Sequence, residues 1–455
     1  MQYKPFKELF ASPLRNGLTK PKAVRGAGTK MVNMGELFAN PRIVNVPMDR
    51  VPLNQTERGS SLLAAGDLLF ARQSLVLSGA GKCSIFVTDD EEVTFESHVI
   101  RCRLNCDLAD PHFYFYFFSS PAGRKLIESI VEQGAGASGI RGSDLAELEV
   151  PWIPPATQTR VALVLRTLDE KIAVNRSINQ TLEAVTQAIF KSWFIDFDPV
   201  KAKIAAIHEG RDPLRAAMSA ICGKLESELD ALPPEQYEQL SATAALFPAE
   251  IEEFEWGEIP KGWAFKSVSD IAQFAKGKVY VSSLNEDTYI STENMLENRA
   301  GVTRATSLPS VATVPAFTAG QVLVSNIRPY FKKIWMARFD GGRSPDVLAF
   351  VPSDPQWSEF LYNLLYQDSF FEFMTRTAKG AKMPRGDKDA IMGWKFPCPD
   401  AFLMTHFSEK VRPNYGHIES LTSENKSLAE LRDTLLPKLL SGELSVSSAT
   451  MEVEA

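Results

Sequence analysis

Two glycine-rich loops, each ending in Arg-Gly, hold the side chains best suited to contacts with a nucleic acid. Glycine lets a backbone approach a phosphate closely, and an arginine fork binds a phosphate or a guanine through two hydrogen bonds. The loops therefore predict DNA contacts, although a structural turn whose arginine packs on the next strand would give the same pattern. Their predicted DNA-binding residues are Gly136, Arg141 and Gly142 in the first loop and Gly380, Lys382, Arg385 and Gly386 in the second.

Two shorter clusters carry side chains that suit base recognition. Arginine and glutamine match the hydrogen-bonding edges of guanine and adenine in the major groove. In the second cluster basic residues alternate with aromatic ones, a pattern that also fits a strand with its polar face in water. The predicted contacts are Arg72, Gln73 and Ser74 in the first half of the chain and Arg328, Lys332 and Lys333 in the second.

Patterns that would indicate catalysis are weak. Residues 134–139 match a dinucleotide fingerprint literally, but a helix is expected before them, where the fingerprint requires a strand. Residues 78–84 lack the first glycine of a phosphate-binding loop, and the acidic pair at 169–170 lies on a helical heptad. No Ser/His/Asp set or methyltransferase phrase is evident, and the five cysteines and five histidines have no metal-binding spacing. We expect neither a catalytic residue nor a metal site in this chain.

The charge distribution is compatible with DNA binding despite a formal net charge of −7. Residues 200–258 carry 5 basic and 12 acidic groups, whereas residues 1–155 carry 17 of each and residues 259–403 carry 17 basic and 14 acidic. Binding follows local potential rather than total charge. With no apolar run long enough for a membrane span and no signal-peptide core, the sequence predicts a cytoplasmic protein with reduced cysteines.

Two long helices must position these loops, over residues 157–194 and 404–442. A single constant shift, which places Ile172 on Ile418, aligns the first with the second, and both show apolar residues at heptad spacing. The pattern favours packing of the two helices against each other, with helices on separate cores as the alternative. The predicted seam consists of Leu165, Leu168, Ile172, Asn175, Asn179, Leu182 and Ile189 in the first helix and Ile418, Leu421, Asn425, Leu428 and Leu435 in the second.

Three features refine this helix pair. Asn179 and Asn425 occupy matching positions, and a paired asparagine in a seam fixes register. Pro413 has no counterpart in the first helix and predicts that the second effectively begins there. An aromatic cluster near the end of the first helix either closes the core of the pair or docks a partner subunit. It comprises Phe190, Trp193, Phe194 and Phe197.

Each long helix follows a segment of about 150 residues with similar order. Short runs of β-branched and aromatic residues predict strands, and an aromatic-rich helix, a Gly…Arg-Gly loop and a short strand ending in proline follow. The fold class is therefore α+β, with two α+β domains and two long antiparallel coiled-coil helices in a pseudo-two-fold repeat.

Three segments of the chain resemble sequences of type I restriction-modification specificity subunits. LDEKIAVNRSINQTLEAVTQAIFKSWFIDFDPV resembles the central spacer of that family, GEIPKGW the start of a recognition domain, and LLPKLLSGEL the C-terminal ending. The first domain lacks a GEIPKGW-like start. The implied domains are 1–155 first target-recognition domain, 156–199 central spacer helix, 200–255 acidic connector, 256–403 second target-recognition domain, 404–444 C-terminal spacer helix and 445–455 disordered tail.

The resemblance implies a non-catalytic subunit that reads an asymmetric, bipartite site in double-stranded DNA. It further implies that two methyltransferase subunits bind around the spacer and that restriction subunits join them. S-adenosylmethionine, ATP and magnesium would then belong to those partners, with no cofactor in this chain. The residues alone leave open an alternative, a coiled-coil adaptor whose α+β domains bind proteins.

Overall fold

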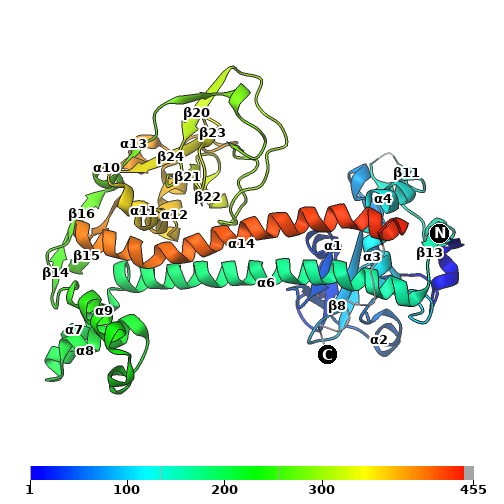
Figure 1. The fold of residues 1–455 in the computed structure, drawn as a ribbon, viewed down its shortest axis with the longest axis horizontal. Coiled ribbons are helices and arrows are strands. Elements are labelled where there is room, and N and C mark those ends of the chain that lie inside the picture. The colour runs from blue at the N-terminus through cyan, green and yellow to red at the C-terminus, as the bar shows by residue number, and fades with distance from the viewer. Residues whose placement is uncertain (1, 135, 256, 445–455) are drawn as a thin grey trace. The chain divides into compact units, whose positions relative to one another are not determined.

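Two long helices, α6 (Pro155–Phe194) and α14 (Ala401–Ser441), run through a computed structural model of the chain (Figure 1). α14 begins at Ala401, more than three turns before Pro413, so the prediction that the second helix starts at that proline is wrong. The Asp400 carboxylate caps the true start by accepting a hydrogen bond from the Leu403 amide at 2.7 Å. Buried Val411 and Tyr415 hold the helix on both sides of the proline.

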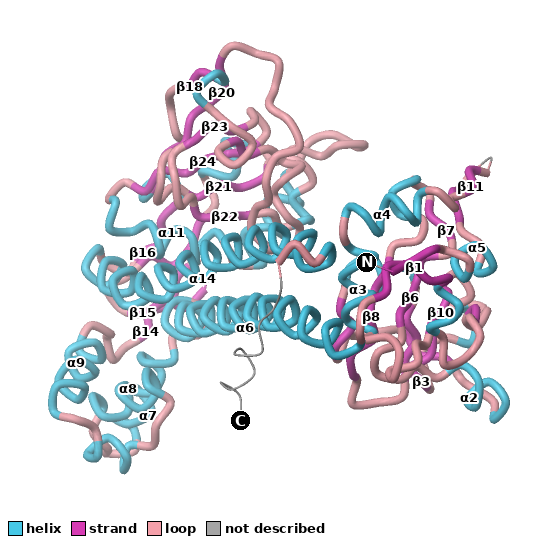
Figure 2. Tube along the Cα trace, turned by 45° about the vertical axis from the view of Figure 1, so that its right-hand side comes forward, coloured by secondary structure: helices cyan, strands magenta, loops and turns pink. Residues whose placement is uncertain are grey.

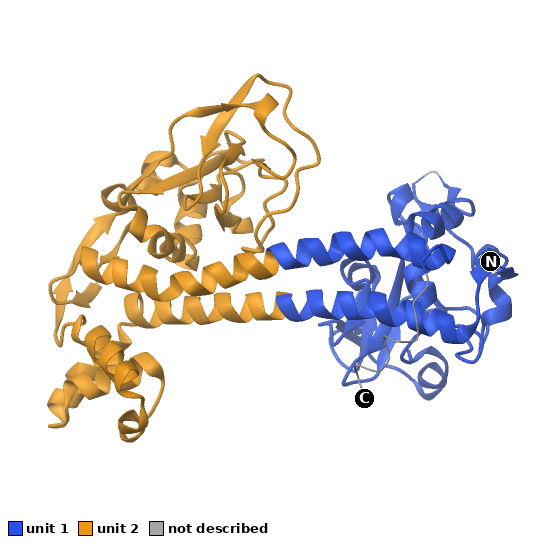
Figure 3. Cartoon of the chain, viewed as in Figure 1, with its two compact units in different colours: residues 1–175, 423–455 blue, residues 176–422 orange. Residues whose placement is uncertain are grey.

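The structure describes residues 2–134, 136–255 and 257–444, and the predicted tail at 445–455 lies outside them. The chain forms two units: unit 1 contains residues 1–175 and 423–455, and unit 2 contains residues 176–422 (Figure 3). Each unit therefore includes half of α6 and half of α14.

Within each unit the two half-helices lie antiparallel. In unit 1, Asp169 contacts Arg432 at 2.7 Å and Asn175 contacts Asn425 at 3.1 Å, so positions rise along α6 as they fall along α14. In unit 2, the Asn414 amide donates to the Thr186 hydroxyl at 3.2 Å. These contacts confirm that the long helices pack on each other.

A five-stranded sheet of order β2-β10-β6-β8-β4 forms the centre of the first α+β domain (Figure 2). Three smaller sheets surround it, of order β5-β3-β9, β11-β12-β7 and β1-β13. The strands are β1 (Gln2–Pro5), β2 (Arg15–Asn16), β3 (Thr29–Val32), β4 (Arg42–Val44), β5 (Asp49–Val51), β6 (Leu68–Ala71), β7 (Gln73–Ser74), β8 (Cys83–Thr88), β9 (Val93–Phe95), β10 (Val99–Cys102), β11 (Glu132–Gln133), β12 (Ser138–Gly139) and β13 (Glu149–Trp152).

The aromatic-rich helix of this domain lies in its core. All six residues from Phe113 to Phe118 are buried, because a helix that is apolar on every side is stable only when it is enclosed. Leu436, Leu439 and Leu440 of α14 complete the same core. The short helices are α1 (Met34–Ala39), α2 (Gln55–Ser61), α3 (Pro111–Ser119), α4 (Pro121–Glu128), α5 (Gly142–Ala146), η1 (Phe6–Leu9), η2 (Lys22–Val24) and η3 (Leu77–Gly79).

The second α+β domain has two four-stranded sheets, β17-β24-β21-β22 and β18-β20-β23-β19, and the pairs β14-β15 and β16-β25. Its strands are β14 (Ile251–Phe254), β15 (Gly257–Pro260), β16 (Ala264–Ser267), β17 (Ala272–Phe274), β18 (Lys278–Tyr280), β19 (Tyr289–Ile290), β20 (Thr313–Phe317), β21 (Val322–Ser325), β22 (Ile334–Met336), β23 (Gly341–Arg343), β24 (Val347–Pro352) and β25 (Lys395–Cys398). Its helices are α10 (Val268–Ile271), α11 (Ser358–Leu365), α12 (Asp368–Thr377), α13 (Lys388–Met392), η5 (Val281–Ser283), η6 (Pro329–Phe331) and η7 (Pro355–Trp357).

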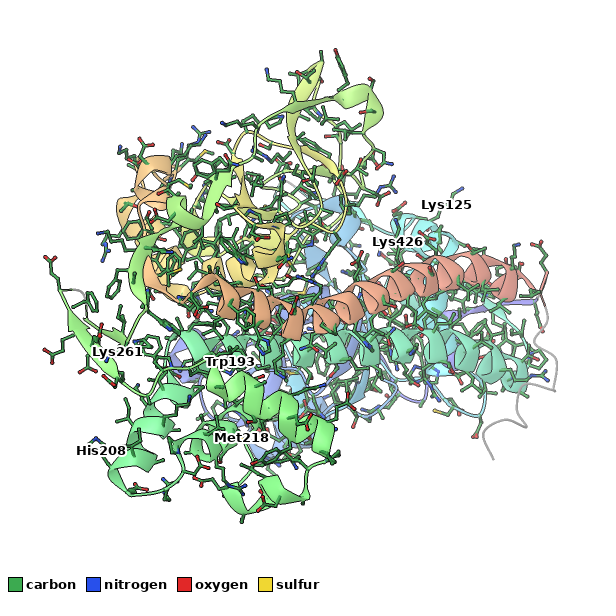
Figure 4. The ribbon with its side chains drawn as sticks, turned by 60° about the vertical axis from the view of Figure 1, so that its left-hand side comes forward. Lys125, Trp193, His208, Met218, Lys261 and Lys426 are labelled. Carbon is green, nitrogen blue, oxygen red and sulfur yellow. The ribbon has the colours of Figure 1, made fainter. Side chains whose placement is uncertain are left out.

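A small helical module occupies most of the segment predicted as an acidic connector. Ala217, Met218, Leu229 and Ala244 form a core of its own, and Met218, labelled in Figure 4, is fully buried. The segment is thus folded, because its scattered apolar residues face one another across short helices. These are α7 (Asp198–His208), α8 (Pro213–Cys222), η4 (Glu226–Ala231) and α9 (Pro234–Ala245).

The α+β fold class and its repeat are confirmed. In each domain a short helix, a strand and a long helix follow one another at the same spacing. Each of these three elements in the second domain begins at the same number of residues after its counterpart in the first. That number is the shift that places Ile172 on Ile418 in the sequence. The pairs are α5 and α13, β13 and β25, and α6 and α14.

Candidate nucleic-acid interface

In unit 1 the structure brings two predicted segments together. We call them the first loop pair: residues 72–82, which join β6 to β8, and residues 132–134 with 136–141. β7 pairs with β12 in an antiparallel register, with Gln73 opposite Gly139. The Ile140 amide donates to the Arg72 carbonyl at 2.9 Å. Segments that lie far apart in the sequence therefore form one surface.

A cleft of about 780 Å³ lies on the first loop pair. Predicted residues line it together with polar groups from the N-terminal segment. Its lining includes Lys7, Asn16, Arg72, Gln73, Glu132, Gln133, Gly139, Arg141, Gly142 and Ser143. Amide, hydroxyl and guanidinium groups at the same cleft are the side chains that proteins use on phosphates and base edges.

The close contact in this pair depends on a glycine other than the predicted one. A Cβ atom at Gly139 would lie 2.9 Å from the Arg72 carbonyl oxygen, closer than real Cβ contacts allow. A Cβ at Gly136 would meet no atom within 4 Å. At Gly142 the nearest atom would be the Leu14 methyl group at 3.7 Å, an ordinary contact. Close approach of the two segments therefore requires Gly139.

The arginines of the first loop pair are held differently. The Arg141 guanidinium donates to the Glu132 carboxylate at 2.7 Å, and both side chains are more than half exposed. Exposed ion pairs contribute little to stability, so a phosphate can replace the carboxylate at small cost. Arg72 is half-buried, and no side chain in the described parts of the chain pairs with its guanidinium.

Unit 2 repeats the arrangement in a second loop pair, residues 326–333 between β21 and β22 and residues 378–387. Ile327 pairs with Arg385 in an antiparallel bridge. The Arg328 amide donates to the Pro384 carbonyl at 2.8 Å, and the Gly386 amide donates to the Asn326 carbonyl at 3.1 Å.

The two Arg-Gly sequences are not equivalent in the structure, so their match in the sequence is misleading. α5 begins at Gly142 and α13 at Lys388, which makes Asp387 the counterpart of Arg141. Asp387 caps α13 by accepting from the Asp389 amide at 3.0 Å. Arg385, two positions earlier, takes the strand position that Gly139 occupies in unit 1.

Arg385 makes a two-pronged ion pair in unit 2. Its Nε and Nη2 atoms each lie 3.1 Å from an oxygen of Asp346, and the arginine side chain is 56% exposed. A Cβ at Gly386 would lie 2.7 Å from the Asn326 amide oxygen, so that side chain would have to shift. Gly380 has a φ of +101°, a conformation that favours glycine. Lys382 is exposed between these glycines.

The basic cluster at 328–333 is a short turn of 3₁₀ helix rather than the strand that the alternative interpretation expects. Arg328 and Lys332 flank η6 in left-handed conformations, with φ of 49° and 50°. Lys332 donates to the Asp368 carboxylate at 2.6 Å, and Lys333 donates to the Thr292 carbonyl at 2.8 Å. Both ammonium groups therefore have partners within unit 2.

The carboxylate beside Lys332 is strongly stabilised in its charged form. Hydrogen bonds from Arg299 and from Lys332 lower the pKa of Asp368 to about 2. Arg328 lies over the Phe331 ring, with 5.9 Å from its Cζ to the ring centroid, and its Nε is buried without a hydrogen-bond partner among the described residues. Of the three predicted basic residues here, Arg328 is the one whose charged group has no hydrogen-bond partner within those ranges.

Sequence reasoning missed the acidic partners of Arg141 and Arg385. Glu132 lies 9 residues before Arg141, and Asp346 lies 39 residues before Arg385. No periodic pattern links these positions, because the strand pairing of each loop pair creates the contacts. Charge alone could have suggested only that some carboxylate would be near.

Asparagines of the predicted seam meet across the helix pair, but not as the pair that the sequence alignment suggested. The Asn175 amide donates to the Asn425 amide oxygen at 3.1 Å and to the Glu424 carboxylate at 2.9 Å. Asn179, expected to match Asn425, donates to the Thr422 hydroxyl at 3.2 Å. In antiparallel packing, positions rise along one helix as they fall along the other, so residues with equal heptad positions need not meet.

Burial along the seam is uneven. Four predicted residues are buried: Leu165, Ile172, Asn175 and Leu421. The others are half-buried: Leu168, Asn179, Leu182, Ile189, Ile418, Asn425, Leu428 and Leu435. The aromatic cluster at the end of α6 belongs to the core of unit 2, where Phe190, Phe194 and Trp193 pack on Phe407. Trp193 is labelled in Figure 4. The members of the cluster are at most 8% exposed, which favours core closure over partner docking.

Two other features are absent from the described residues. No group of three or more His, Cys, Asp or Glu side chains there is placed to hold a metal ion. Within those same ranges, none of the helices combines the length and the apolar character that a membrane span requires.

Comparisons with known proteins agree on one family. Residues 2–184 match the family described as type I restriction modification DNA specificity domain. The HindI type I restriction enzyme specificity subunit of Haemophilus influenzae is 30% identical over 403 residues, covering 83% of this chain and 86% of that protein. The MjaIX specificity subunit of Methanocaldococcus jannaschii is 23% identical over 355 residues, covering 73% and 69%.

A solved structure shares the fold. The S subunit of a type I restriction-modification system from M. genitalium has a TM-score of 0.51 with this chain and 16% sequence identity. The similarity covers 96% of this chain and 95% of that one.

Proposed function

This chain belongs to the family of type I restriction-modification specificity subunits, and we propose that its two loop pairs read the two halves of a bipartite DNA target. Family membership supplies the general role, which is DNA sequence specificity within a larger complex. One observation carries the assignment of the site: strand pairing brings the separately predicted polar segments together in unit 1 and again in unit 2.

The content of the loop pairs supports an asymmetric target. Arg72, whose carbonyl bonds the Ile140 amide, corresponds to Asn326, whose carbonyl bonds the Gly386 amide. Gln73 pairs with Gly139 as Ile327 pairs with Arg385. Side chains with different hydrogen-bonding patterns at equivalent positions recognise different bases. The two half-sites should therefore differ in sequence.

Within unit 1, Arg72 and Gln73 read base edges in this proposal, since one has a guanidinium without a partner among the described side chains and the other is exposed. Arg141 and Arg385 exchange a carboxylate for a phosphate or a guanine. Exposed Lys382 contributes a phosphate contact. Lys332 and Lys333 contribute less, because their ammonium groups already have partners in the protein.

We further propose that methyltransferase and restriction subunits perform the chemistry while this chain supplies recognition. Two methyltransferase subunits, one for each half of the helix pair, would match the repeat. S-adenosylmethionine, ATP and magnesium would bind to those partners. The 40 residues of α6 give a helix of about 60 Å, longer than the roughly 34 Å of one DNA turn, which suits a spacer between two recognition sites.

The test begins with the target sequence. Methylation mapping of the host genome gives the modified site, which we expect to be bipartite and asymmetric. The chain assembled with its methyltransferase partner is then titrated with that duplex and with a scrambled duplex at several salt concentrations. Specific binding that weakens with salt supports the proposal, and the slope reports the number of phosphate contacts. Equal, salt-insensitive affinity for both duplexes would refute it.

A further inference from the structure

The first loop pair ends in an exposed apolar tip. Leu75, Val76 and Leu77 directly follow Gln73 and Ser74, and their side chains are 89%, 60% and 46% exposed. Single exposed apolar residues are ordinary, but a run of three on a soluble protein indicates a contact surface. The sequence did not indicate that these residues are exposed, because three consecutive apolar residues in a β-rich segment would normally predict a buried strand.

The tip is held in place from both sides. The Ser74 hydroxyl accepts a hydrogen bond from the Val76 amide at 3.2 Å. Arg124 on α4 donates to the Ser78 carbonyl at 2.9 Å. A Cβ at Gly79 would lie 2.2 Å from the Ser74 oxygen, so the turn closes tightly. These contacts fix the backbone around Leu75. Because the side chain is presented on an ordered backbone, binding to a partner costs less conformational entropy.

The second loop pair presents an apolar ring at the equivalent place. Tyr330 lies in the turn that follows β21, as the tip of unit 1 follows β6, and it is 48% exposed. The two residues that flank its turn, Arg328 and Lys332, are both left-handed, a conformation that is uncommon for residues other than glycine. Both loop pairs therefore present an apolar side chain beside groups suited to polar base edges.

We propose that Leu75 and Tyr330 contact the C5 methyl group of thymine in the major groove. This inference rests on the proposed function of the two loop pairs. Thymine carries the one apolar group on the major-groove edges of the four bases, and apolar side chains recognise it there. Each loop pair then combines polar readers, such as Arg72 and Gln73, with one methyl reader. Leu75 and Tyr330 are therefore specificity-determining residues. Mutagenesis limited to polar side chains would miss their effect.

Deoxyuridine tests the contact directly because it differs from thymidine only by that methyl group. Each thymine of the mapped target is replaced singly, and the dissociation constant is measured with the assembled complex. The wild-type complex should lose about fourfold in affinity at one thymine of the half-site read by unit 1, the effect of burying one methyl group. L75A should bind thymine and deoxyuridine at that position equally.

Matched variants separate this contact from general effects. Leu225 is 69% exposed on the helical module, and L225A should keep the full deoxyuridine penalty. For the other half-site, Y330A should lose the penalty whereas Y330F should keep it, because the ring rather than the hydroxyl makes the contact. Thermal unfolding of each variant should match the wild type, since the altered side chains are exposed.

The outcomes distinguish the inference from the function beneath it. A half-site without a thymine penalty, or a penalty unchanged in L75A or Y330A, overturns the methyl contact while specific binding persists. Loss of assembly with the methyltransferase partner in L75A would show that the tip binds protein and would also overturn it. If the wild-type complex shows no sequence-specific binding, the proposed function itself fails.

Discussion

The arginines of the two Arg-Gly sequences, Arg141 and Arg385, each form an ion pair with a carboxylate although they occupy different positions in the repeat. Each guanidinium is paired with one carboxylate, Arg141 with Glu132 and Arg385 with Asp346, and each arginine side chain is more than half exposed. The carboxylate orients the guanidinium and keeps it away from other partners, yet in water the pair contributes only a few tenths of a kcal/mol. In the proposed function, such an arginine would be ordered before DNA binds and would leave its carboxylate at small cost.

Arg385→Ala should therefore reduce DNA affinity much more than stability. We expect a loss of about 1–3 kcal/mol in binding if the fork grips a base or phosphate. Arg385→Lys keeps the charge but loses the fork, so it should recover only part of the affinity. Titration with target and scrambled duplexes measures both effects. Wild-type affinity and site preference in the alanine variant would assign Arg385 a purely structural role.

Gly139 and Gly136 allow a comparison within one loop. Gly139→Ala forces a Cβ to within 2.9 Å of the Arg72 carbonyl oxygen, so the paired segments must separate. We expect it to cost about 1–3 kcal/mol of unfolding free energy, as overpacked sites do. Gly136→Ala meets no neighbour and should be close to neutral. Chemical denaturation of the two variants checks this, and equal midpoints would contradict the close contact.

At the scale of elements, the helix pair shows what a heptad pattern determines. The spacing identifies a helix and its apolar face, because side chains one heptad apart lie on the same side. It does not determine the axial register between two helices, which follows from the tertiary contacts at their ends. Asn175 rather than Asn179 therefore meets Asn425.

Asn175→Ala should destabilise unit 1 by roughly 1–3 kcal/mol, because it leaves the half-buried amide oxygen of Asn425 without its partner. Asn179→Ala removes a single hydrogen bond, to Thr422, which is more exposed than the bond between Asn175 and Asn425. Its loss should cost less unfolding free energy, about 0.5–1.5 kcal/mol. Replacing Asn175 and Asn425 together by leucine should restore stability while loosening register. Denaturation midpoints give the first two values. A larger effect at Asn179 would contradict the observed register.

In the loops, residue type identified candidate side chains but not their structural equivalence or their partners. Residue type alone identified Arg72, Gln73 and Arg385 as candidates, and the strand pairing places each of them on a loop pair. The equivalence of the two Arg-Gly sequences failed, because a shift of two positions changes which side chain lies on the paired strand and which caps the following helix. Glu132 and Asp346 could not have been identified, since only the folded sheet brings them to their arginines.

At the scale of the whole molecule, the repeat keeps its framework and varies the side chains that we propose to read DNA. The helices and strands that follow each loop pair keep one constant offset, whereas equivalent reading positions hold Gln73 in one copy and Ile327 in the other. In the proposed function, the constant elements preserve the geometry of the site, and the variable side chains would change which bases it accepts.

Gln73→Ala should consequently relax preference at one position of one half-site and leave the other half-site unchanged. Loss of a bidentate base contact costs about 1–3 kcal/mol of discrimination. Selection from a library of duplexes randomised across both half-sites, with the assembled complex, measures the preference at every position. Relaxed preference in both halves, or in neither, would be inconsistent with separate readers.

The composition of unit 1 also has a consequence for biosynthesis. Its core is closed by Leu436, Leu439 and Leu440, which leave the ribosome only after the whole of unit 2 has been translated. Translation proceeds at about 5–20 residues per second, so the core of the N-terminal domain stays incomplete for on the order of tens of seconds, until these leucines have been synthesised. During that interval its apolar face is open to chaperones and to other nascent chains. A premature stop codon near the 3′ end of the message would thus damage the domain that is translated first.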